Sequence, residues 1–199
     1  MQVTAARSPR SQATTRRLLD AAEASFAARG YHATRVDDIV ERAGTSHGTF
    51  YRYFASKDAA FTALLELVAE EFAELATQLP TLSPNDDSHR ALVSWLGAFI
   101  DLYRVHWPLL RSWIETEQRD DASGELATEL IRTLASAMAE RVTGRRSRQP
   151  DRQLGSIILV GLIDRLAYYC ESGQATADDA AITTTLADAI MSAWFPLRG

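Results

Sequence analysis

The sequence predicts an all-α protein of about nine helices, in which a small N-terminal helix-turn-helix domain precedes a larger helical domain. Three observations predict this fold class. Apolar residues recur at the three- and four-residue spacing of helices along almost the whole chain. Strand-like alternation of apolar and polar residues nowhere extends far enough to predict a strand. Near the N-terminus, about three residues separate two short helical segments, which is helix-turn-helix spacing.

The first two helices have recognisable ends. The first is expected over Ser11–Arg29, and Gly30 stands where a left-handed C-terminal cap would lie. The second begins after Thr34, whose hydroxyl can accept from the following turn while Asp37 reaches back, as in a capping box. Gly44 ends this second helix after about two turns.

The third helix is short and rich in aromatic residues. Thr45 or Ser46 can cap it, so it is expected over His47–Phe54. Phe50 and Phe54 are four residues apart, share one face and are expected in the core. Tyr51, Arg52 and Tyr53 lie between these two phenylalanines in the sequence. They are not needed in the core, because a short helix packs only one apolar face against it, so a role outside the core is expected for them.

The rest of the chain continues the helical pattern. Residues 79–88 carry two prolines among polar turn-forming residues and indicate a connection. Pro108 occupies a favourable first-turn position for a new helix. Ser56 is a cap candidate for the fourth helix. The remaining helices are expected at Ser56–Gln78, His89–Arg104, Pro108–Arg119, Ser123–Val142, Asp151–Ser172 and Ala177–Trp194.

Composition and charge narrow the function. The chain has 199 residues, of which 46% are hydrophobic and 24% charged, as in ordinary globular proteins. Residues 1–60 hold nine Lys/Arg against six Asp/Glu, whereas residues 61–199 hold twelve against twenty, so a polyanionic partner is expected for the N-terminal part only. A single cysteine, no secretory signal and no long apolar segment predict a cytoplasmic protein without a membrane partner.

From Arg16 to Leu65 the chain reads "RRLLDAAEASFAARGYHATRVDDIVERAGTSHGTFYRYFASKDAAFTALL". A short helix, a tight turn, an aromatic-rich helix and an F-x-S-K-[DE] segment follow one another here. This arrangement resembles the tetracycline-repressor (TetR) family of bacterial transcriptional regulators. The resemblance covers about a quarter of the chain, and residues 80–199 share only the number and length of helices with that family.

The resemblance implies a DNA-binding domain at residues 1–60 and a ligand-binding and dimerisation domain at residues 61–199. The third helix would be the recognition helix of a regulator that binds a double-stranded DNA operator. Hydroxyl, guanidinium and ring groups on an exposed helix face suit phosphates and base edges, and the ammonium of Lys57 would hold a phosphate at the start of the next helix. The residues expected to face DNA are Thr34, Arg35, Thr45, Ser46, His47, Gly48, Thr49, Tyr51, Arg52, Tyr53 and Lys57.

The C-terminal domain would bind a small, largely apolar or aromatic ligand and form a homodimer, since relatives do both. For the aromatic residues expected to bind the ligand, an aromatic-rich core is the alternative interpretation. The expected ligand-binding residues are Trp95, Phe99, Tyr103, Trp107, Leu110, Trp113 and Tyr168. The expected dimer-interface residues are Ile157, Val160, Gly161, Asp164, Ile182, Leu186 and Ile190.

The sequence bears on two other classes of function. An enzyme is disfavoured, because the chain carries no glycine-rich phosphate loop, nucleophile elbow or metal-spaced cluster, and neither a cofactor nor a metal is expected. A helical dimeric adaptor or small-molecule-binding protein without operator binding remains as an alternative, but the outward Tyr51, Arg52, Tyr53 and Lys57 argue against it. The favoured hypothesis is a dimeric repressor that its ligand releases from a pseudo-palindromic operator.

Overall fold

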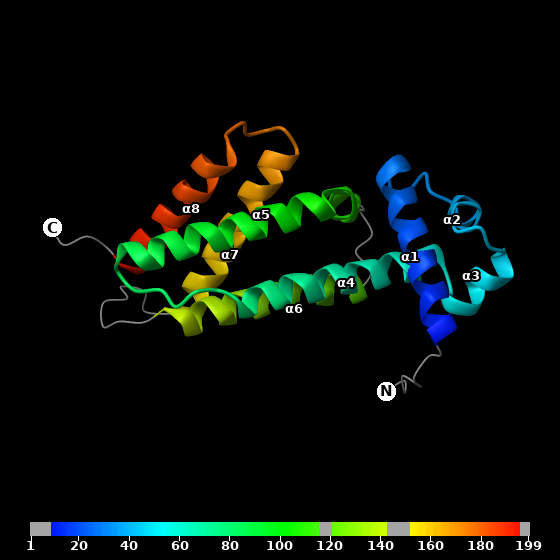
Figure 1. Ribbon diagram of the computed structural model, residues 1–199, viewed down its shortest axis with the longest axis horizontal. Helices are drawn as coiled ribbons and strands as arrows, with labels where there is room; N and C mark the ends of the chain where they lie inside the picture. The colour runs from blue at the N-terminus through cyan, green and yellow to red at the C-terminus, as the bar shows by residue number, and fades with distance from the viewer. Residues whose placement is uncertain (1–8, 116–120, 143–151, 196–199) are drawn as a thin grey trace. The chain divides into compact units, whose positions relative to one another are not determined.

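A computed structural model describes residues 9–115, 121–142 and 152–195. Its helices, labelled in Figure 1, are α1 (Pro9–Arg29), α2 (Val36–Arg42), α3 (His47–Tyr53), α4 (Lys57–Thr77), α5 (Asp86–Glu115), α6 (Asp121–Arg141), α7 (Arg152–Glu171) and α8 (Asp179–Trp194). Within those ranges the only β-pairing is an isolated bridge between Leu82 and Val142, so the predicted all-α class is confirmed. None of the described helices is long and apolar enough to cross a membrane.

Helix α5 replaces two of the predicted helices. The sequence predicts separate helices at His89–Arg104 and Pro108–Arg119, whereas the structure has one helix with Pro108 inside it. Proline lacks the N–H that would reach the carbonyl four residues earlier, so one hydrogen bond is lost. The helix continues on both sides of Pro108. The hydroxyl of Ser112 donates to the Pro108 carbonyl at 2.9 Å. A proline therefore does not end this helix.

The chain groups into two compact units. The first comprises the described parts of Met1–Val68 and Pro108–Ser123, and the second comprises those of Ala69–Trp107 and Gly124–Gly199. The functional division at residues 60 and 61 stays a prediction.

In the first unit, α1, α2 and α3 lie together beside the start of α4 (Figure 1). Phe26 of α1 and Phe61 of α4 meet edge to face with ring centroids 5.2 Å apart, and both are buried. Ile39 of α2 and Phe50 of α3 are fully buried in the same unit. Each of these helices thus packs one apolar face against the core and exposes its opposite face to solvent.

The caps at the start of α3 and α4 match the predicted positions. The Ser46 hydroxyl accepts from the backbone N–H of Thr49 at 3.2 Å, and the Ser56 hydroxyl accepts from that of Ala59 at 3.1 Å. Each cap satisfies one backbone donor that a helix start leaves without a partner.

The second unit is a bundle made by the end of α4, α5 up to Trp107, α6 from Gly124, and α7 and α8 (Figure 1). The indole Nε1 of Trp95 donates to the carbonyl of Leu75 at 2.8 Å. The guanidinium of Arg141 donates to the carbonyls of Leu79 and Thr77 at 2.8 and 3.0 Å. A cation at the last carbonyls of α4 offsets the negative end of its dipole.

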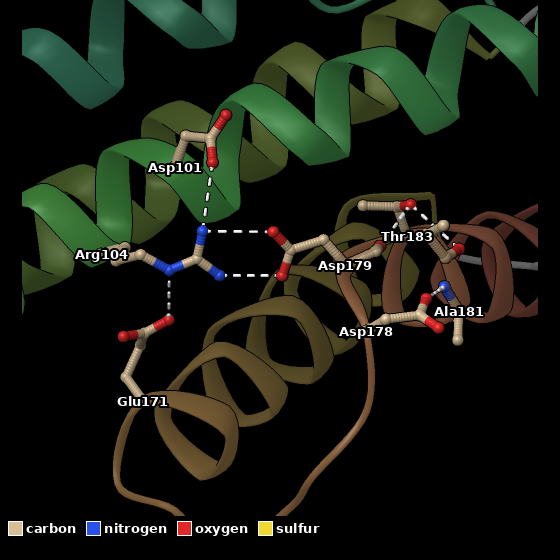
Figure 2. Close-up of polar contacts among 8 residues, drawn as sticks. Asp101, Arg104, Glu171, Asp178, Asp179, Ala181 and Thr183 are labelled. Atoms are coloured by element: carbon tan, nitrogen blue, oxygen red, sulfur yellow. Dashed lines mark hydrogen bonds and ion pairs between the residues drawn. The ribbon is translucent and has the colours of Figure 1, made fainter.

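Arg104 of α5 binds the last residue of α7 and the first residue of α8 (Figure 2). Arg104 donates through two nitrogens to Asp179 at 2.8 and 3.2 Å and through Nε to Glu171 at 3.0 Å. A longer contact of 3.3 Å reaches Asp101. The Asp178 carboxylate beside it caps α8. The bidentate fork thereby fixes the start of α8 against α5.

Candidate nucleic-acid interface

The turn between α2 and α3 sets the position of the predicted recognition helix. Gly44 has a φ of 59°, a left-handed value that glycine adopts without steric cost. The backbone N–H of Thr45 donates to the carbonyl of Val40 at 2.9 Å, and that of Gly44 donates to Glu41 at 3.1 Å. This pair of bonds is a Schellman motif, which ends α2 and turns the chain directly into α3.

Helix α3 presents two unlike faces. Phe50 and Phe54 are buried, with ring centroids 5.7 Å apart, as predicted. Tyr51 is 54% exposed although it is a large ring, and Arg52 beside it is exposed. The apolar face therefore anchors the helix, while the aromatic and cationic face meets solvent.

The predicted DNA-facing residues divide by exposure. Those exposed are Arg35, Ser46, His47, Gly48, Tyr51 and Arg52. Those half-buried are Thr45, Thr49, Tyr53 and Lys57. One of the predicted set, Thr34, is buried.

The prediction that the Thr34 side chain faces DNA is wrong. Its side chain is 1% exposed, and its hydroxyl donates to the carbonyls of Gly30 at 2.7 Å and Ser25 at 3.1 Å. The predicted capping box of Thr34 with Asp37 is also wrong, because Arg35 is the N-cap and the carboxylate of Asp38 accepts from its backbone N–H at 2.8 Å. Thr34 thus closes the turn between α1 and α2, where it cannot offer its hydroxyl to a phosphate.

Lys57 supports the same turn. Its Nζ donates to the carbonyls of Tyr31 at 2.8 Å and Thr34 at 3.1 Å, and it lies 4.2 Å from the centre of the Tyr31 ring. The phenol of Tyr31 in turn donates to Asp58. Burial lowers the pKa of Lys57, since a shielded ammonium is less favourable than a hydrated one. The ammonium predicted at a phosphate is therefore used within the first unit.

Tyr53 connects α3 to α1. Hydrogen bonds from the side chains of Ser11, the largest cause, and of Thr14 and Arg52 lower the pKa of the Tyr53 phenol. The guanidinium of Arg52 lies 5.2 Å from the centre of the Tyr53 ring. Tyr53 therefore holds Arg52 and the end of α3 beside the start of α1.

A contact that the sequence does not indicate joins α2 to the first residue of α3. Nε2 of His47 lies 2.7 Å from Oδ1 of Asp37. The two residues are ten positions apart across the turn, so neither helical spacing nor a motif could have paired them.

The family model described as "Bacterial regulatory proteins, tetR family" matches residues 18–64, the segment that builds this interface. Residues 18–64 thus form a tetR-family segment. It is similar to the HTH-type transcriptional activator FasR of Mycolicibacterium smegmatis, with 28% identity over 175 residues that cover 85% of this chain and 78% of that protein. It also matches the HTH-type transcriptional repressor SCO4008 of Streptomyces coelicolor, with 32% identity over 107 residues, 54% of this chain and half of that one.

Solved structures agree with this tetR-family fold. The transcriptional regulator FadR of Bacillus subtilis, solved in complex with stearoyl-CoA, superposes with a TM-score of 0.69 at 19% identity and covers 89% of this chain and 98% of its own. The resemblance predicted from the sequence is thus confirmed. The protein is a DNA-binding transcriptional regulator and not an enzyme.

The second unit contains a row of aromatic rings. Successive ring centroids lie 5.8 Å apart from Trp95 to Phe99, 6.3 Å to Tyr103, 6.1 Å to Trp107 and 5.6 Å to Tyr168. The first three are buried and the last two half-buried. Burial, the larger cause, and the nearby Asp164 raise the pKa of Tyr103, so its phenol stays neutral. The two other predicted ligand-binding residues, Leu110 and Trp113, belong to the first unit.

The predicted dimer residues split between surface and core. Ile157, Gly161 and Asp164 are exposed on α7. The expectation for the other four was wrong, because they fill the second unit's own core: Val160, Ile182, Leu186 and Ile190. Other large apolar side chains on α7, which the sequence pattern does not single out, are also exposed, namely Leu154, Ile158, Leu162 and Tyr169.

Within the described parts of the chain, no group of three or more His, Cys, Asp or Glu side chains could hold a metal ion.

Proposed function

We propose that this protein is a homodimeric repressor whose two recognition helices bind a pseudo-palindromic operator, and that a small, largely apolar ligand releases it. The observation that carries the DNA-binding part is the two-faced α3, in which Phe50 is buried and Tyr51 is 54% exposed. An exposed phenol and guanidinium on a helix that the core already anchors are suited to phosphates and base edges.

The proposed DNA contacts are the predicted residues that retain exposed surface. Tyr51 and Arg52 reach the backbone and base edges, and Arg35 extends the contact from the start of α2. The full set is Arg35, Thr45, Ser46, His47, Gly48, Thr49, Tyr51, Arg52 and Tyr53. Lys57 acts indirectly, because it holds the turn that ends at Arg35.

Dimerisation is supported by the outer face of α7. Ile158 is 61% exposed, and Leu154, Ile157 and Leu162 lie at helical spacing beside it. A contiguous apolar stripe of this kind marks a protein–protein interface rather than a solvated surface. A two-fold axis through it would present two copies of α3 to two half-sites, which multiplies the selectivity of one short helix.

Ligand response is supported by the aromatic row from Trp95 to Tyr168 and by the course of α4. The rings provide apolar, polarisable surface with phenol groups from Tyr103 and Tyr168. Helix α4 begins at Lys57, which holds the α1–α2 turn, and ends at Thr77 in the second unit. A ligand that favours one arrangement of this helix changes DNA affinity by its differential affinity for the two states.

The DNA-binding proposal is tested with a randomised duplex library from which the protein selects its operator. Wild-type protein is expected to enrich a sequence with two inverted half-sites. Arg52→Ala should weaken binding to that site and lower the slope of log K against log salt by roughly 0.9. Arg90→Ala is the control, because it removes another exposed arginine, this one from the second unit, and should leave both quantities unchanged. Equal binding by wild type and Arg52→Ala would refute the assignment.

Dimerisation and ligand response have separate tests. Ile158→Glu should convert the dimer to a monomer in sedimentation velocity, whereas Ile131→Glu, at another exposed isoleucine on α6, should not. The B. subtilis relative was solved with stearoyl-CoA, so a long-chain acyl-CoA is the first ligand probe. It should release the selected duplex, and Trp107→Ala should raise the concentration required. An adaptor without operator binding is the alternative, and it predicts a dimer that enriches no sequence.

A further inference from the structure

We propose that Asp37 sets the base preference of the recognition helix by holding the imidazole of His47 in one orientation and one hydrogen-bonding pattern. This inference rests on the DNA-binding role proposed above. Residues at the N-terminal end of a helix-turn-helix recognition helix are the ones that contact base edges. His47 is the first residue of α3, and its ring is exposed.

The geometry of the pair defines where the hydrogen lies. Nε2 of His47 is 2.7 Å from Oδ1 of Asp37. An ionised carboxylate can only accept a hydrogen bond, so Nε2 must carry the hydrogen. Asp37 is available for this contact because the neighbouring Asp38 makes the cap of α2 and pairs with Arg29 at 3.0 Å.

The contact restricts what His47 can offer to DNA. With Nε2 used by Asp37, the polar atom of the ring that remains is Nδ1, and the ring cannot rotate without losing the bond. Without Asp37, the two nitrogens can exchange roles and the ring can turn to suit several bases. A base edge that matches one fixed pattern is distinguished from the others, whereas a freely adapting ring distinguishes little.

The charge of Asp37 acts in the same direction. Its side chain is 73% exposed in the unit proposed to meet DNA, so it repels phosphates at any sequence. This repulsion lowers non-specific binding, while the oriented ring adds a contact only at the matching base pair. A feature that penalises wrong partners as well as rewarding the right one increases specificity. Asp37 is thus a positioning residue that acts through His47.

The experiment compares base preference in a double-mutant cycle. Wild type, Asp37→Ala, His47→Ala and the double variant are each titrated with the library-selected duplex and with duplexes changed at one base pair at a time. Asp37→Ala should lose about fivefold of its discrimination at one base pair, the value of one hydrogen bond, and bind unrelated duplex more tightly. His47→Ala should lose discrimination at the same base pair, and the double variant should lose no more than either single variant.

Glu41→Ala is the matched control, since it removes an exposed carboxylate from the same helix. It should strengthen binding to all duplexes equally and leave base preference unchanged. An exposed contact between two side chains contributes little to folding, so the variants keep the fold. The proposal is overturned if Asp37→Ala keeps the wild-type preference at every base pair, or if the losses fall at different base pairs and add. A wild-type protein that enriches no sequence would overturn the proposed function instead, and this inference with it.

Discussion

Replacement of Lys57 by alanine distinguishes two roles for its ammonium group, support of the α1–α2 turn and contact with a DNA phosphate. The structure gives Lys57 two hydrogen bonds to the carbonyls of Tyr31 and Thr34, at 2.8 and 3.1 Å, and a position 4.2 Å from the Tyr31 ring centre. A hydrogen bond from a charged donor contributes about 1.5–3 kcal/mol and a cation–π contact about 0.5–1 kcal/mol. Part of this is offset by the desolvation that lowers the pKa of Lys57. We expect Lys57→Ala to reduce the free energy of unfolding by about 2 kcal/mol.

The assay pairs thermal unfolding with the salt dependence of DNA binding. At about 2–4 °C per kcal/mol for a chain of this size, Lys57→Ala should lower the melting temperature by about 4–8 °C. Its salt slope, measured on folded protein, should stay at the wild-type value. Arg52→Ala provides the opposite pattern, with an unchanged melting temperature and a slope smaller by roughly 0.9.

A phosphate contact by Lys57 predicts a different result. In that case Lys57→Ala would keep the wild-type melting temperature, and its salt slope would fall by about one unit because one phosphate contact is lost. That outcome would refute the assignment of the ammonium to the α1–α2 turn.

Four further variants test the local structure by thermal unfolding. Gly44→Ala should destabilise by about 1–2 kcal/mol because φ is 59° there, whereas Gly97→Ala, in an ordinary helical position with open space around it, should stabilise by up to about 1 kcal/mol; equal effects would contradict the argument. Ser46→Ala should cost about 1 kcal/mol as the cap of α3, and no loss would mean that the cap is dispensable. Arg104→Ala should cost about 1 kcal/mol near neutral pH, since the pair is half-exposed. Arg104 lowers the pKa of Asp179, so this stabilisation is complete above the unfolded pKa of about 3.9 and is lost as pH falls through the folded value; the two melting curves should converge in acid, and a constant gap would exclude the ion pair as the cause.

The features predicted correctly from the sequence are local ones. Helix ends at Gly30 and Gly44 and caps at Ser46 and Ser56 follow from the chemistry of a few consecutive residues. The four-residue spacing of Phe50 and Phe54 likewise predicts their shared buried face. The tetR-family segment is recognisable for the same reason, because its signature is a continuous run of such local signals.

The errors concern contacts that residues of one helical segment make outside that segment. Thr34 is a good cap by composition, yet its hydroxyl is drawn into the turn by carbonyls of Ser25 and Gly30. Ile182 is as apolar as the exposed Ile158, and only the packing of the second unit decides which of them is covered.

The sequence by itself determined an all-helical chain with a short outward-facing aromatic helix near its N-terminus, because periodicity and capping act over one or two turns. Only the tertiary structure decided which partner each polar group meets. It assigned the Lys57 ammonium to two carbonyls and the Asp37 carboxylate to His47, and it continued α5 through Pro108. Such pairings depend on how separate helices pack against one another, and residues that meet in this way share no pattern along the chain.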